Sequence, residues 1–143
     1  MDFKETLQQI VNLPTEAKVK MAVESYVKLL PVLQAIDKDN NGAGLIVAVI
    51  ATAVGADGKV TKEERAFVQA LFKAHKVELS DADVDKMVKN YTGDDWRGLV
   101  SKLAGILNPE SKAHLALLCA AICAIDNTIS KDEVAFLASI FVA

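Results

Sequence analysis

The sequence predicts an all-α protein, and three observations carry this prediction. Apolar residues recur at the spacing of amphipathic helices, several segments open with a side-chain oxygen followed three residues later by an acid, and no segment makes a convincing strand. We expect a compact bundle of about seven to eight helices. With 143 residues, of which 52% are hydrophobic and 24% charged, the chain can bury one core without disulfides. We therefore expect a single domain over residues 1–143.

The N-terminal segment, residues 1–40, is expected to hold two helices. The first ends near Asn12, and the second runs from Thr15 to Ile36 with a kink at Pro31. The apolar side of the second helix is expected to carry Val19, Val23, Val27 and Leu30. A loop follows over residues 37–42.

The next segment, residues 43–75, predicts a helix, a turn and a helix. An almost uniformly apolar helix reaches Ala56, the chain turns through residues 57–60, and a second helix starts at Thr61, with Glu64 placed to complete a capping box. The buried side of this second helix is expected to carry Phe67, Val68, Leu71 and Phe72.

Two intervening helices are expected within residues 80–107, the first opened by Ser80 and the second by Thr92 or Asp94. In the last segment, residues 109–143, an apolar helix runs through Ile125. A turn over residues 126–129 and a helix from Ser130, with Glu133 in the capping-box position, complete the chain.

An internal repeat organises the second and fourth of these segments. Residues 45–72 align without a gap on residues 114–141, which places Asp57 on Asp126 and Glu64 on Glu133. We expect two pseudo-symmetric helix-turn-helix units around a central pair of apolar helices, because such helices must bury against something. We predict that this pair is antiparallel and that the two acidic turns are neighbours.

These residues resemble the TerB-like domains of tellurite-resistance and stress-response systems. The resemblance rests on residues 48–72, with their Ala-Asp-Gly-Lys-Val-Thr-Lys-Glu-Glu run, and on residues 117–141. It implies a bacterial, non-enzymatic helical module that acts through protein partners, including other components of a membrane-associated resistance complex. It also implies a cytoplasmic location at the inner face of the membrane.

The same resemblance implies metal binding at the acidic turns. By motif match the ligands are Asp57, Glu64, Asp126 and Glu133, with Glu63 and Asp132 as secondary candidates. Converging carboxylates repel one another unless protons or a cation neutralise them. Oxygen ligands favour calcium or magnesium over zinc. The competing interpretation is that Glu64 and Glu133 only cap their helices, which would leave a pure protein-interaction module.

A second candidate for calcium is the loop with Asp37, Asp39 and Asn41, which reproduces the opening of an EF-hand loop. Its ending departs from that motif, because Ala48 stands where a bidentate glutamate is needed. The alternative is an ordinary Asn/Asp/Gly loop.

Several other functions are not expected. The net charge of −3 has no basic stripe, which argues against nucleic acid. The N-terminus does not resemble a secretory signal, and the apolar runs are too short to span a membrane. Cys119 and Cys123, four residues apart in an apolar segment, are interpreted as core residues. No Ser/His/Asp or Cys/His set indicates an enzyme, such as a metal-assisted hydrolase.

Overall fold

Eight α-helices occur among the residues that the computed structural model describes, which are 3–39, 42–55, 60–74, 76–91, 94–125 and 131–141. In chain order they are α1 (Phe3–Val11), α2 (Thr15–Ile36), α3 (Ala43–Val54), α4 (Lys62–Lys73), α5 (Asp81–Asn90), α6 (Asp94–Ile106), α7 (Pro109–Cys123) and α8 (Lys131–Phe141). These residues contain no strand. The all-α prediction is confirmed. Within the same residues, no helix is both long enough and apolar enough to cross a membrane.

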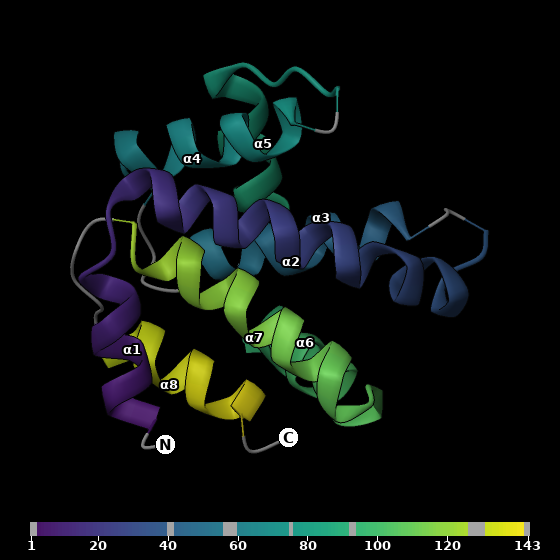
Figure 1. Ribbon diagram of the computed structural model, residues 1–143. Helices are drawn as coiled ribbons and strands as arrows, with labels where there is room; N and C mark the ends of the chain where they lie inside the picture. Colours follow the sequence, from purple (N-terminus) through teal and green to yellow (C-terminus); the bar gives the residue numbers. More distant parts are fainter. Residues whose placement is uncertain are drawn as a thin grey trace.

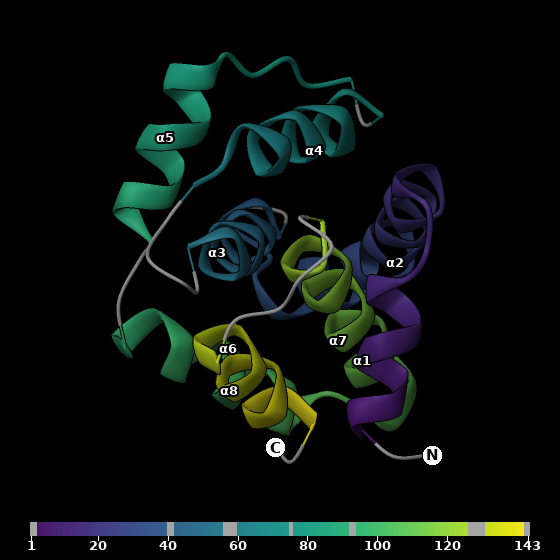
Figure 2. The same cartoon turned by 90° about the vertical axis from the view of Figure 1, so that its left-hand side faces the viewer.

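The helices are arranged in three layers (Figures 1 and 2). Helices α2, α3 and α7 form the middle layer, α4 and α5 cover one side of it, and α1, α6 and α8 cover the other. The most extensive contact between any two helices joins α2 to α7. The predicted core helices α3 and α7 therefore lie in the centre, where both can be buried on several sides.

Helices α3 and α7 meet at their C-terminal ends. The thiol sulfur of Cys123, the last residue of α7, lies 3.7 Å from the carbonyl oxygen of Ala53 near the end of α3. Both helices run in the same sense across Figure 1. The predicted antiparallel arrangement is wrong. Short loops favour antiparallel neighbours, whereas α4, α5 and α6 separate these two helices along the chain. The pseudo-symmetry of the two units stays a prediction from the alignment.

Helix α2 turns a different face to the core from the one predicted. Its buried apolar residues are Ala22, Tyr26, Leu29 and Leu33. The predicted Val27 is 53% exposed, and Val19, Val23 and Leu30 are only partly buried. Apolar residues lie on several sides of α2, so its sequence alone did not distinguish the core face from the flank. The helix continues through Pro31 to Ile36.

Helix starts follow the local cap signals. The side chains of Thr61, Ser80 and Asn108 each accept a hydrogen bond from the backbone N–H three residues later. Capping boxes are complete at Thr61 and Ser80. These caps satisfy backbone donors that the first turn of a helix leaves without partners. The predicted capping residue Ser130 lies outside the described residues.

Candidate functional site

The two glutamates at matching positions of the repeat are both buried. Glu64 near the start of α4 is 1% exposed, and Glu133 near the start of α8 is 4% exposed. Ionised carboxylates are almost never buried so completely without compensating partners. These side chains therefore mark an unusual polar region within an apolar core.

A capping box fixes the Glu64 carboxylate at the start of α4. Its Oε1 atom accepts a hydrogen bond of 2.9 Å from the backbone N–H of Thr61, whose hydroxyl oxygen in turn accepts one of 3.1 Å from the Glu64 N–H. The second carboxylate oxygen, Oε2, is also buried. Phe67, Val68 and the other predicted apolar residues of α4 anchor this helix to the core, as expected.

Cys123 connects the two carboxylates at the meeting point of α3 and α7. Its pKa lies well above the usual value, first because the thiol is buried, and then because of the negative charge of Glu133, the neighbouring Cys119 and the negative charge of Glu64. A hydrogen bond to Glu133 contributes as well. The charges of both glutamates therefore act on one thiol, so the structure brings Glu64 and Glu133 into the same region.

Both cysteines are free, buried thiols, as the sequence indicated. Burial raises the pKa of Cys119 to about 12. A thiol with so high a pKa forms little thiolate, which is the reactive species. Neither side chain has the properties of a catalytic nucleophile.

A buried lysine, which the sequence pattern did not reveal, lies at the same place. Lys18 on α2 is 0% exposed, and its ammonium Nζ donates a hydrogen bond of 2.8 Å to the carbonyl oxygen of Ala124, the C-cap of α7. A cation is favourable at this position, because the last carbonyl groups of a helix carry partial negative charge. The available signal was the spacing of Lys18 with Ala22 and Leu29 along the buried face of α2.

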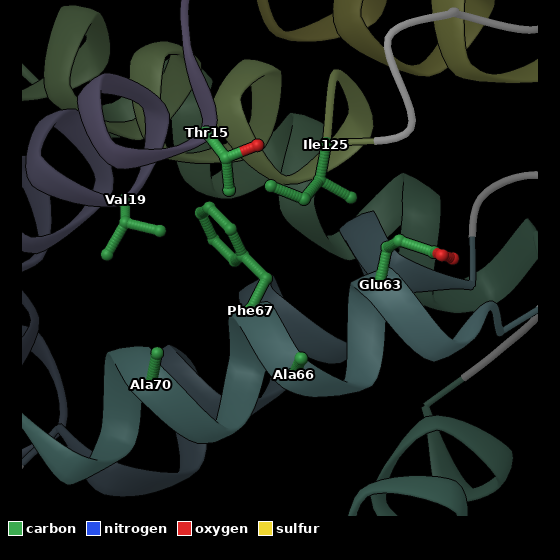
Figure 3. Close-up of a pocket in the computed structure, with 7 residues that line it drawn as sticks. All are labelled: Thr15, Val19, Glu63, Ala66, Phe67, Ala70 and Ile125. Carbon is green, nitrogen blue, oxygen red and sulfur yellow. The ribbon is translucent and has the colours of Figure 1, made fainter.

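An apolar hollow of about 280 Å³ adjoins this region between α2 and α4 (Figure 3). Ile125, which directly precedes the second acidic turn, and Glu63, which follows the first, both line it. The other lining residues are Thr15, Val19, Ala66, Phe67 and Ala70. Two residues that flank the turns therefore line one hollow. Most of each turn lies outside the described residues, so the proximity of the turns stays a prediction.

The remaining candidate ligands are divided between exposed residues and residues outside the described part of the chain. Glu63 and Asp132 are exposed. Asp57 and Asp126 lie outside the described residues. Among the described residues, no three or more His, Cys, Asp or Glu side chains form a group that could hold a metal ion. Any complete ligand set would therefore have to include side chains beyond these.

The second calcium candidate falls on a helix boundary. Asp37 is the C-cap of α2, and its carbonyl oxygen accepts a hydrogen bond of 3.0 Å from the N–H of Gly42. Helix α3 begins directly after Gly42, so Ala48, the twelfth position of the motif, is buried within a helix. Asp39 is exposed, and Asn41 lies outside the described residues. The described part of this segment caps two helices and does not form a twelve-residue loop.

Comparison with known proteins adds no family assignment. No protein-family model, curated protein or solved structure matches the chain.

Proposed function

We propose that this protein is a non-enzymatic, TerB-like stress module that binds a divalent cation at its paired acidic turns. The observation that carries the proposal is the position of Glu64 and Glu133. They come from different helices and aligned segments, they are 1% and 4% exposed, and both act on the same buried thiol. Two buried carboxylates in one region favour the uptake of positive charge.

In this proposal the turns supply the rest of the ligand set. Asp57 and Asp126, which align in the sequence, complete the set with Glu64 and Glu133. All four are oxygen donors, which select calcium or magnesium. The capping role of Glu64 is compatible with ligation, because a carboxylate has two oxygens and Oε1 alone accepts the Thr61 N–H.

The biological part of the proposal rests on the resemblance to TerB-like domains. By that resemblance the protein acts in bacterial tellurite or stress resistance through protein partners. Those partners hold it in the cytoplasm at the inner face of the membrane.

Calorimetric titration with calcium and with magnesium tests the proposal. We expect a dissociation constant on the order of 0.1–1 mM, the range of weak oxygen-ligand sites. Glu64→Gln and Glu133→Gln each remove a charge but keep a side chain that suits a capping box, so both variants should fold normally. Each should bind the cation about tenfold more weakly or worse, because a ligand is lost. Glu110→Gln is the matched control, since the Glu110 side chain is 86% exposed and lies at the far end of α7.

The complete capping box at Thr61 and Glu64 favours a second candidate, a pure protein-interaction module. In that case Glu64 serves only the start of α4. Titration of the unaltered protein would then release no heat of binding, and the Glu64→Gln substitution would change nothing. The two candidates therefore differ in the first measurement.

A further inference from the structure

Lys18 brings a positive charge to the place where α7 ends. Lysine is rarely buried unless its ammonium group has partners. Lys18 is 0% exposed, and its Nζ atom donates to the Ala124 carbonyl at 2.8 Å. Because α2 packs along α7, the long lysine side chain reaches the C-terminal end of α7 from within the core.

The surroundings of this ammonium group are negative. Ala124 follows Cys123, whose thiol hydrogen-bonds with Glu133 and is also within electrostatic reach of Glu64. The C-terminal end of α3 meets the same thiol at Ala53. Helix C-termini carry partial negative charge, and the N-termini of α4 and α8 offset it with partial positive charge. Among the described residues, the buried side chains with a full charge are Lys18, Glu64 and Glu133.

We infer that Lys18 is the internal counter-cation of the Glu64 and Glu133 carboxylates, and that it competes with a divalent cation for them. The first half of this inference stands on the burial of the three side chains, on the hydrogen bond from Lys18 to Ala124, and on the effect of both glutamates on the adjacent Cys123. The second half rests on the proposed cation-binding function. In the cation-free protein the ammonium group stabilises the buried carboxylates, and a bound divalent ion replaces or repels it.

Coupling between these side chains tests the first half without any metal. Denaturant unfolding, with a chelator present, gives the midpoint of each variant. The single variants are Lys18→Met, Glu64→Gln and Glu133→Gln, and each double variant combines Lys18→Met with one of the two glutamate substitutions. Interacting residues give non-additive changes in such a cycle. We expect each double variant to be more stable than the sum of its single shifts predicts. The reason is that Lys18→Met leaves the buried carboxylates without their counter-charge, and removal of one carboxylate reduces that cost.

Lys20→Met is the matched control, because Lys20 lies on the same helix and is exposed. It should show additive shifts with both glutamate variants. If Lys18→Met does not fold but either double variant does, the inference is supported. Additive shifts for Lys18, or double variants that fail to fold as well, would overturn it.

Cation titration tests the second half. Lys18→Met should bind calcium or magnesium about tenfold or more tightly than the unaltered protein, because the substitution removes a nearby positive charge that repels the cation. Equal or weaker binding by Lys18→Met would refute the competition. If non-additive coupling is found but neither protein binds a cation, the counter-cation role stands and the proposed function fails. If a cation binds but the coupling is absent, the proposed function stands and the counter-cation role fails.

Discussion

Replacement of Gly42 by alanine tests how α2 and α3 are joined. Gly42 has a φ of 76°, in the left-handed region, and it precedes α3 directly. A Cβ atom there would lie 2.9 Å from the backbone nitrogen of Gln34 and 3.1 Å from the carbonyl carbon of Leu33. Both atoms belong to the backbone of α2, so they cannot move aside as the end of a flexible side chain would.

Two costs add up in Gly42→Ala. The left-handed conformation costs an L-residue about 1–2 kcal/mol. Relief of the close contact costs about 1–3 kcal/mol more, as is usual when an extra carbon enters a packed region. We therefore expect the free energy of unfolding to fall by about 2–5 kcal/mol. Because domains of this kind are stable by roughly 5–15 kcal/mol, most of the variant should still fold.

Urea unfolding followed by circular dichroism measures this loss. With a slope of about 2 kcal/mol per molar urea, the midpoint should fall by about 1–2.5 M. Gly105→Ala is the matched control, because its Cβ would meet nothing within 4 Å and the residue lies inside α6. It should gain about 0.5–1 kcal/mol from higher helix propensity. Equal midpoints for the two variants would refute both the positive φ and the close approach.

Three further predictions concern the cap of α4 and the buried thiols. Thr61→Ala removes the acceptor of the Glu64 N–H, so the free energy of unfolding should fall by about 1 kcal/mol. Thr61→Ser keeps a hydroxyl acceptor and should keep this stability. Equal unfolding midpoints for the two variants would count against the cap. A thiol-specific disulfide reagent should label Cys119 and Cys123 only as fast as the protein opens, and rapid labelling in the native state would disprove their burial. Folding raises the Cys119 pKa from 9.0 to about 12, so this thiol stabilises the fold fully below about pH 9 and loses that contribution as the pH rises toward 12. Alkaline unfolding curves of the unaltered protein and Cys119→Ala check this, and they should differ in slope only above about pH 9.

Much of the fold could be predicted because its signals are local. Thr61 with Glu64, Ser80 with Asp83, and Asn108 before a proline each define a helix start within a few residues. Nothing beyond the neighbouring sequence is needed for such caps to form. The helix boundaries could therefore be placed within about three residues along most of the described chain.

The arrangement of the helices could be predicted only in part, because it depends on contacts between distant residues. The core face of α2 was misplaced by about one position, since both Val27 and the buried Leu29 fit an apolar stripe. The relative direction of α3 and α7 depends on how the three helices between them pack, and no short-range pattern encodes that packing. Tertiary packing decides both features.

The residues of the candidate site could be singled out only in part. Alignment of the repeat drew attention to Glu64 and Glu133, and the structure buries both near one thiol. Their equivalence and their role as ligands stay predictions. Lys18 was missed because its buried position shows only once the correct face of α2 is known. Cys123 was interpreted correctly as a core residue. Its contact with Ala53 could not be foreseen from the sequence, because it joins residues 70 positions apart.

The proposed function depends above all on the two acidic turns forming one cation-binding region. The most direct measurement is a nuclear magnetic resonance titration of isotope-labelled protein with calcium and with magnesium. We predict that amide signals beside both turns, at Gly55 and Ile125, shift together with one dissociation constant. Glu64→Gln and Glu133→Gln should each weaken the response at both positions. Unchanged signals at both positions, or a response in which each substitution affects only its own turn, would contradict a shared site.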